Sequence, residues 1–281
     1  MLINDKLFYI KDVEPETYDD SLIRYSSELW QCDIGGGGEK KLCLFKGLSI
    51  SPSERILVYG DSIYMMMLNQ PYDSENKMLP AHYELIKYDI KENKMAQLCR
   101  IDDDHYCSNA NICGIWDEKL IFSRSHAKND KPYLEQITEY AAEQGISEEK
   151  AYAAFDSSHP FIVEYLSADL KTGELSPLTL PVPAAITEKG YYYSDNGELT
   201  ILDNDRKTKQ IGRIDDGAMV TEVNGWLFFP DNGKFRAYNE STGENIEAVI
   251  TALPEWTDGK DMIYLDENSP DEITYKKVNL T

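Results

Sequence analysis

The sequence predicts an all-β fold made of six repeats of four antiparallel strands, and three observations lead to this prediction. An aromatic-rich apolar segment, followed by a second segment that ends in Asp or Asn, recurs along the 281 residues. The clearest second segments are Tyr83–Asp89, Phe161–Asp169, Glu198–Asp203 and Lys234–Asn239. The 19 tyrosines and a hydrophobic content of 42% favour strands that enclose a core. Turn residues separate the later segments into repeats of roughly 35 residues, which is the period of β-propeller blades.

The second strand of each repeat, strand B, has the clearest pattern. The B strands are expected at Lys6–Ile10, Ser62–Leu68, Lys119–Ser123, Gly190–Tyr193, Gly225–Phe229 and Asp261–Leu265. The preceding A strands are expected at Ile56–Tyr59, Ile112–Trp116, Ala184–Thr187, Ala218–Val223 and about Ala248–Leu253. Asn224-Gly225 and similar pairs between them suit tight hairpins, which need positive φ angles. The first repeat leaves little room for an A strand, so Met1–Ile3 are expected to complete the last repeat.

The recurring phrase, a strand ending in Tyr-Asp before a Lys-, Glu-, Asn- or Gly-containing turn, resembles bacterial β-propellers of the TolB-like, PQQ-like and DUF5050-like type. Tyr88-Asp89 and Tyr238-Asn239 are examples. The resemblance covers nearly the whole chain and implies one β-propeller domain, residues 1–281. The repeats counted above give this propeller six blades. It implies no particular activity, because these families include sensors, binding modules and enzymes.

The links between the second and third strands, B and C, divide the repeats into two groups. They are long in the first three repeats, at about Lys11–Ser26, Asn69–His82 and Arg124–Pro160. In the last three they are short, as at Ser194–Gly197 and Pro230–Gly233. Because chain direction alternates at every strand, all B–C links emerge on the same face, where long loops are usually functional.

The third long link contains the periodicity of a helical hairpin, expected at about residues 132–156. Tyr133, Ile137 and Ala141 recur at helical spacing, and Gly145 is placed to end that helix. Ser147 then caps a second helix that begins with acidic residues. This hairpin is expected either to cover part of the propeller or to act as a partner-binding lid.

Charge and composition exclude several classes of partner. The net charge is −22, from 28 basic and 50 acidic residues, so no nucleic-acid partner is expected. The sequence contains no long apolar span and no signal-peptide pattern, so we expect no membrane insertion and a cytoplasmic location, or an extracytoplasmic one if the sequence is a trimmed ectodomain. The five cysteines form no CxxC pair, which argues against a disulfide framework and a zinc site, and Cys32, Cys43 and Cys113 are expected to be buried thiols.

No catalytic, metal or cofactor signature is present. The histidines show no HxH or HExxH spacing. The acidic run Asp102–Asp104 beside His105 lacks the spacing of a calcium loop, and Gly35–Gly38 lacks the lysine of a phosphate-binding loop. We therefore expect no catalytic residues, no metal and no cofactor.

The sequence favours a non-enzymatic binding propeller whose partner, a protein or a small-molecule or sugar ligand, meets the face with the long B–C links. The binding residues expected there are Tyr18, Arg24, Tyr72, His82, Arg124, His126, Tyr133 and His159. One alternative is a carbohydrate-active or other hydrolytic propeller with axial carboxylates. Another is a structural or interaction module of a larger cell-surface lipoprotein. The sequence does not indicate the oligomeric state.

Overall fold

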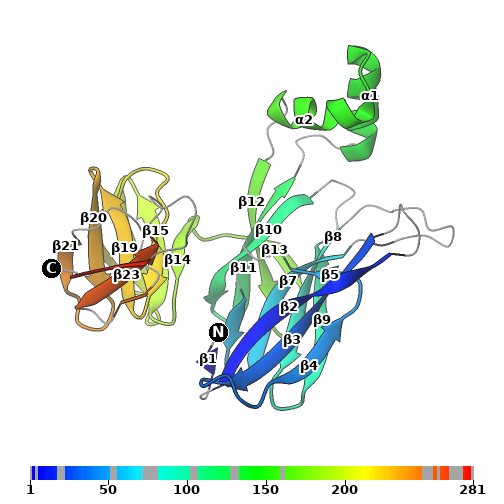
Figure 1. The fold of residues 1–281 in the computed structure, drawn as a ribbon. Helices are drawn as coiled ribbons and strands as arrows, with labels where there is room; N and C mark the ends of the chain where they lie inside the picture. The colour runs from blue at the N-terminus through cyan, green and yellow to red at the C-terminus, as the bar shows by residue number, and fades with distance from the viewer. Residues whose placement is uncertain are drawn as a thin grey trace. The chain divides into compact units, whose positions relative to one another are not determined.

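The fold is described from a computed structural model of the chain (Figure 1). It describes residues 2–3, 6–17, 23–50, 56–69, 71, 82–101, 107–126, 133–158, 162–248, 256–257, 260–265 and 275–279. These form two compact units, one of residues 1–112 and 118–177 and the other of residues 113–117 and 178–281. The expectation of one domain over residues 1–281 stays a prediction.

The described strands form six antiparallel sheets in chain order, which we call blades one to six. Four of them contain four strands in the order A-B-C-D, as an up-and-down β-propeller blade requires. The chain therefore has the all-β, β-propeller fold that the sequence predicts. Strand B runs into strand C at one end of each sheet. We call this end the B–C end of the blade.

Blade one differs from the prediction in two ways. Its strands are β1 (Leu2–Ile3), β2 (Lys6–Thr17), β3 (Ile23–Asp33) and β4 (Lys40–Phe45). Leu2 and Ile3 pair with β2, so they form the A strand of blade one, and the expectation that they complete the last repeat is wrong. The expected link Lys11–Ser26 is mostly strand, because β2 and β3 pair as far as Thr17 and Ile23. A register shift between Val13 and Glu16 accommodates Pro15, which has no backbone N–H to donate to the ladder.

Blade two has an A strand in two pieces. Its strands are β5 (Leu48–Ser49), β6 (Leu57–Tyr59), β7 (Ser62–Asn69), β8 (His82–Asp89) and β9 (Lys94–Ile101). β5 pairs with the end of β7 at Asn69, and β6 pairs with its beginning. The predicted link Asn69–His82 has the observed bounds, since β7 ends at Asn69 and β8 begins at His82.

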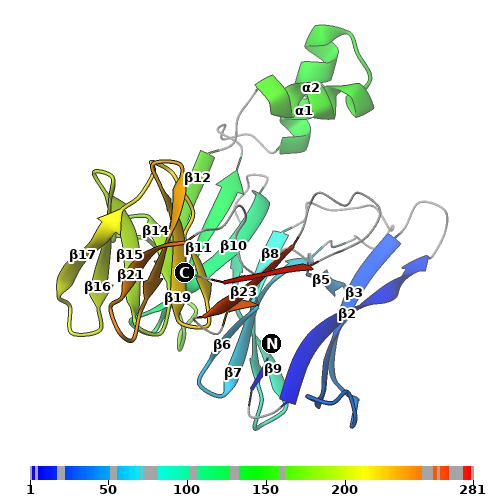
Figure 2. The same ribbon diagram turned by 60° about the vertical axis from the view of Figure 1, so that its left-hand side comes forward.

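Blade three carries the helical hairpin. Its strands are β10 (Cys107–Trp116), β11 (Lys119–His126), β12 (Ile162–Asp169) and β13 (Leu175–Pro177). Between β11 and β12 lie α1 (Tyr133–Gln144) and α2 (Glu148–Ser158), as predicted (Figure 2). Gly145 ends α1 with a φ of 64°, and Ile137 and Ala141 pack on Ala151 and Phe155 of α2. The two apolar faces therefore cover each other.

Blades four to six have compact hairpins. Blade four contains β14 (Pro183–Ile186), β15 (Gly190–Asp195), β16 (Glu198–Asp203) and β17 (Thr208–Arg213). Blade five contains β18 (Thr221–Val223), β19 (Trp226–Asp231), β20 (Lys234–Asn239) and β21 (Asn245–Ala248). The predicted tight turns are confirmed by positive φ at Asn196, Gly197, Asn232 and Gly233.

The last blade corrects one strand prediction. Its described strands are β22 (Trp256–Thr257), β23 (Asp261–Leu265) and β24 (Tyr275–Asn279). β22 is the A strand, so the expected position at about Ala248–Leu253 is wrong, and Ala248 instead ends β21. The prediction failed because the hydrophobic pattern of a short segment does not fix where a strand lies. The pattern therefore did not distinguish Ala248–Leu253 from Trp256–Thr257.

The recurring Asp or Asn caps the turn between the third and fourth strands. The Asp169 carboxylate accepts hydrogen bonds from the backbone N–H groups of Thr172 and Lys171, at 2.8 and 2.9 Å. Asn239 accepts the equivalent bonds from Ser241 and Thr242 through its side-chain oxygen. The recurring phrase therefore has a structural cause, because an Asx side chain satisfies the backbone groups that the turn leaves unpaired.

Blades pack through alternate side chains of their strands. Phe8 and Leu29 of blade one form a core with Met65, Met67 and Ile86 of blade two, all at most 3% exposed. The same alternation places Leu227 and Phe229 of blade five against Tyr192 and Leu199 of blade four. In blade five the other face of strand B, with Trp226 and Phe228, packs on Met262 of blade six.

Candidate functional site

The B–C end of blade two contains a buried polar cluster of Asn69, His82 and Glu84. Asn69 ends β7 and lies directly opposite His82, the first residue of β8. Glu84 lies two residues further along β8, so its side chain is on the same face as that of His82. This face also carries Met67 and Ile86, which pack against blade one. His82 is 6% exposed and Glu84 is 9% exposed, so the cluster is at the edge of the core.

Hydrogen bonds orient the imidazole ring. Asn69 Nδ2 donates to Glu84 Oε1 at 2.7 Å, and His82 Nε2 lies 3.1 Å from the same oxygen. A carboxylate only accepts hydrogen bonds, so Nε2 is the protonated nitrogen. His82 Nδ1 is buried and has no hydrogen-bond partner among the residues that the structure describes. In the neutral tautomer with its proton on Nε2, Nδ1 is a hydrogen-bond acceptor.

The B–C end of blade three contains a charged pair. Arg124 of β11 and Glu164 of β12 lie opposite each other. Arg124 donates to Glu164 Oε2 from its NH2 group at 2.9 Å and from Nε at 3.2 Å. The Arg124 side chain is 17% exposed and that of Glu164 is 42% exposed. This pair leaves the carboxylate more open to solvent than Glu84 is.

Glu84 and Glu164 occupy equivalent positions in the repeat. In each of blades one to four a glutamate lies five residues before the Asp that ends strand C, and these residues are Glu28, Glu84, Glu164 and Glu198. Three of the four have a basic partner, and the pairs are Glu28–Lys41 at 2.9 Å, Glu164–Arg124 at 2.9 Å and Glu198–Arg213 at 3.8 Å. In blade two the hydrogen-bonding partners of the glutamate are instead an amide and an imidazole.

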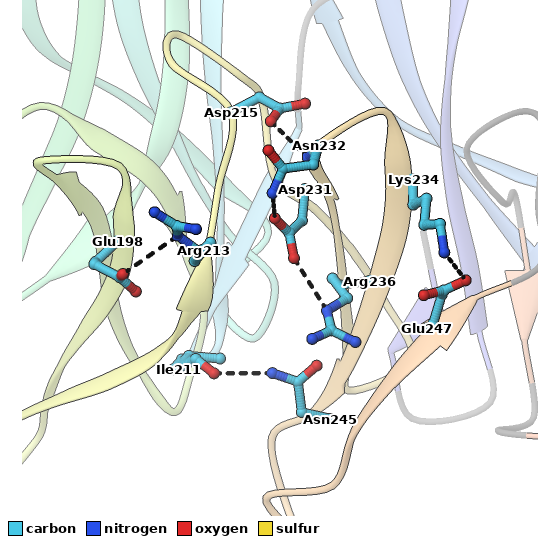
Figure 3. A network of polar contacts seen from close by, with 10 residues as sticks. All are labelled: Glu198, Ile211, Arg213, Asp215, Asp231, Asn232, Lys234, Arg236, Asn245 and Glu247. Atoms are coloured by element: carbon cyan, nitrogen blue, oxygen red, sulfur yellow. Dashed lines mark hydrogen bonds and ion pairs between the residues drawn. The ribbon is translucent and has the colours of Figure 1, made fainter.

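Blades four and five show the ion pairs that the compact B–C ends carry (Figure 3). Blade five reverses the charges, with Lys234 at the glutamate position and Glu247 as its partner at 2.7 Å. Asp231 pairs with Arg236 at 3.3 Å in the same hairpin. Asn245 Nδ2 donates to the Ile211 carbonyl at 2.8 Å and so links blade five to blade four. These contacts explain how the compact hairpins are held and imply no ligand.

Hydrogen bonds lower the pKa of one of these four glutamates. Hydrogen bonds from Lys41 and Trp30 hold the pKa of Glu28 below its usual range. Glu28 therefore stays ionised at neutral pH, in keeping with a role in an ion pair. Burial raises the pKa of the Cys99 thiol to about 11, so this cysteine is a poor nucleophile at neutral pH.

The structure describes the side chains of two of the predicted binding residues, His82 and Arg124. The backbones of Arg24, His126 and Tyr133 lie respectively near the B–C end of blade one, at the end of β11 and at the start of α1. Tyr18, Tyr72 and His159 lie outside the described residues. The partners found for His82 and Arg124 are Asn69, Glu84 and Glu164, which the sequence analysis did not select. Aligning the four glutamates on the Asp that ends strand C would have revealed two of them.

The other candidates from the sequence form no further site among the residues that the structure describes. Gly35–Gly38 form the turn between β3 and β4, as predicted, with positive φ at Gly36 and Gly38. Asp102–Asp104 and His105 lie outside the described residues. Cys32 is buried, while Cys43, Cys99 and Cys113 are half-buried, and none of these four described cysteines forms a disulfide. Within the described ranges, no group of three or more His, Cys, Asp and Glu could hold a metal ion, and no helix is long and apolar enough to span a membrane.

The sequence matches no protein-family model and no curated protein. Among solved structures, oligogalacturonate lyase in complex with manganese is similar with a TM-score of 0.48 and 11% identity, over 92% of this chain and 71% of that one. The β-propeller domain of the Trilobed protease from Pyrococcus furiosus gives a TM-score of 0.43 and 13% identity, over 92% and 77%. Pyrococcus horikoshii acylaminoacyl peptidase gives 0.45 and 14%, over 96% and 45%. At such scores and identities these neighbours assign no function to this chain.

Proposed function

We propose that the chain is a non-enzymatic binding β-propeller whose ligand or protein partner meets the B–C ends of blades one to three. The observation that carries this proposal is the buried Asn69–His82–Glu84 cluster, in which the orphaned Nδ1 of His82 lies where β7 and β8 leave the sheet. A buried polar atom without a partner costs free energy, so such an atom in a folded protein calls for an explanation such as a ligand. The long link between β11 and β12 at the same end of blade three supports the placement.

Arg124 supplies the second feature of the proposed face. Its guanidinium is partly exposed and is held by Glu164, so it is already oriented before a partner arrives. Arginine and aromatic side chains contribute much of the binding energy at many interfaces. The first residue of α1, Tyr133, follows in the same insertion. The kind of partner and the location in the cell belong to this proposal, and so does the oligomeric state. We expect no nucleic-acid partner, no membrane insertion, no metal and no cofactor.

The test combines screening with matched variants. The full chain is screened on arrays of glycans and of peptides, and the strongest binder is measured by calorimetry. The double variant Arg124→Ala/Tyr133→Ala is expected to lose at least tenfold in affinity. The matched control is Arg213→Ala, which removes the equivalent ion pair of blade four and is expected to bind normally. Equal affinity of the double variant and the control, with both folded by circular dichroism, would remove this face from consideration.

A further inference from the structure

Three Asn-Gly pairs form two-residue turns in blades four and five. Two lie at B–C ends and the third joins strands A and B of blade five, and the pairs are Asn196-Gly197, Asn232-Gly233 and Asn224-Gly225. The φ angles are 51 to 53° at the asparagines and 76 to 78° at the glycines. All three asparagines are exposed. The turns therefore share one backbone conformation and differ in their hydrogen bonds.

An Asn-Gly pair in an exposed turn can lose ammonia without an enzyme, and asparagine is a thermolabile residue for this reason. The backbone nitrogen of the glycine forms a bond to the side-chain carbonyl carbon of the asparagine, and the bond from that carbon to its NH2 group breaks. The proton of the glycine N–H passes to water, and ammonia leaves. Water then opens the succinimide ring to give aspartate or isoaspartate. Glycine favours the first step because it has no Cβ to hinder its nitrogen.

The turn at Asn224 has a hydrogen bond on each of the two reacting groups. The Gly225 nitrogen donates to Glu222 Oε1 at 2.7 Å. The carboxylate opposes removal of this proton, because it would then face a second negative charge. Asn224 Nδ2 donates to the Thr257 carbonyl of blade six at 2.8 Å, so the side-chain amide must leave that blade before it can react. Both contacts protect Asn224.

The other two turns lack this protection. At Asn196 and Asn232 the nitrogen of the following glycine donates no hydrogen bond to any residue that the structure describes. Asn196 Nδ2 donates to Asp195 Oδ1 at 2.8 Å, and Asn232 Nδ2 donates to Asp231 Oδ1 at 2.7 Å (Figure 3). Each acceptor belongs to the same hairpin, so the bond is lost when the turn opens. Asp215 holds the backbone N–H of Asn232 at 2.8 Å, but this group takes no part in the reaction.

We propose that Asn196 and Asn232 are sites of spontaneous deamidation and that Asn224 is protected from it. Each reaction adds one negative charge beside Asp195 or Asp231. Isoaspartate also inserts a methylene group into the backbone, and a two-residue hairpin cannot keep its register with a longer chain. The compact B–C turns of blades four and five are therefore the places where this chain first loses its hairpins with age. The inference is independent of the proposed function, which concerns blades one to three.

Peptide mapping by mass spectrometry tests the proposal on the full chain, incubated folded and, in parallel, unfolded in denaturant. Aspartate and isoaspartate are heavier than asparagine and elute separately. In the folded chain we expect Asn196 and Asn232 each to convert at least about fivefold faster than Asn224, the effect of one hydrogen bond of ordinary strength. In the unfolded chain we expect similar rates at all three. Equal rates in the folded chain, or no conversion at Asn196 and Asn232 there, would overturn the proposal.

A pair of variants tests the cause of the protection. Glu222→Ala removes the acceptor of the Gly225 nitrogen and should raise the rate at Asn224 about fivefold. The matched control Glu188→Ala removes another exposed glutamate of the same unit and should leave that rate unchanged. Circular dichroism checks that both variants are folded. A rate at Asn224 in Glu222→Ala that is equal to or below that of the control would overturn the proposal, since the carboxylate would then not protect the turn.

Discussion

Blades two and three place side chains at the same repeat positions as blades four and five but surround them differently. Glu84 and Glu198 both lie opposite the B strand near the B–C end, yet one orients a buried imidazole and the other forms a loose surface pair. Gly173 and Gly243 both end an Asx turn with φ near 73°, yet only at Gly173 does the backbone of a neighbouring blade leave no room for a Cβ atom. The comparison teaches that the repeat fixes the backbone conformation and the strand register. The residues around each position determine whether its side chain is buried and which hydrogen bonds or ion pairs it forms.

The largest difference is expected at the two turn glycines. A methyl group at Gly173 would lie 2.0 Å from the carbonyl oxygen of Leu98, whereas at Gly243 the nearest atom is Lys209 Nζ at 3.9 Å. Gly173→Ala should therefore lower the free energy of unfolding by at least about 3 kcal/mol through overlap and strain. Gly243→Ala should cost only the strain of positive φ, about 1 kcal/mol. Denaturant unfolding of both variants measures the difference, and equal losses would show that local turn geometry alone governs these positions.

The glutamates at the equivalent strand position come next. Glu84→Ala would leave the buried His82 Nε2 and the half-buried Asn69 Nδ2 without an acceptor, which should lower the free energy of unfolding by about 2 kcal/mol. Glu198→Ala removes a pair at 3.8 Å near the surface and should change it by less than about 0.5 kcal/mol. Both values come from the same denaturant titration. If Glu198→Ala proved as costly as Glu84→Ala, the distinction between the two blades would be wrong.

The smallest effect is expected at the residues that cap the turns. Backbone hydrogen bonds from Thr172 and Lys171 hold the pKa of Asp169 below its usual range. Because this pKa is lower in the folded than in the unfolded chain, the stabilisation is present above the unfolded value, about pH 4, and is lost as pH falls through the folded value. Asp169→Asn should keep the turn, as Asn239 does, but flatten the acid dependence of stability. Acid titration of both proteins by circular dichroism checks this, and identical acid profiles would contradict it.

The sequence predicted the parts of the fold that repeat. The Asp and Gly residues of the turns determined the strand positions of blades four and five, because their side chains or positive φ angles define hairpins locally. Leu2–Ile3 were assigned to the wrong repeat, and the strand at Trp256–Thr257 was not predicted. Two residues carry no period, and their pairing depends on other strands. The extension of β2 past Lys11 was missed, since Pro15 in a strand is tolerated only where a bulge removes the need for its N–H.

The candidate site was predictable only in part. His82 and Arg124 could be selected because they lie at the ends of long links, but their partners are set by cross-strand register, which sequence spacing alone does not give. Glu84 was one of 50 acidic residues with no local signal. Its position became meaningful when its register equivalents in the other blades, Glu28, Glu164 and Glu198, were found paired to basic residues.

Hydrogen exchange with and without the strongest binder from the arrays tests the central claim most directly. The proposed function places the partner at the B–C ends of blades one to three. Binding should therefore slow exchange at the ends of β7, β8, β11 and β12, around Asn69, His82 and Arg124. Exchange in the compact turns Asp195–Gly197 and Asp231–Gly233 should stay unchanged. Protection confined to those compact turns, with none at the ends of β7 and β8, would contradict the account.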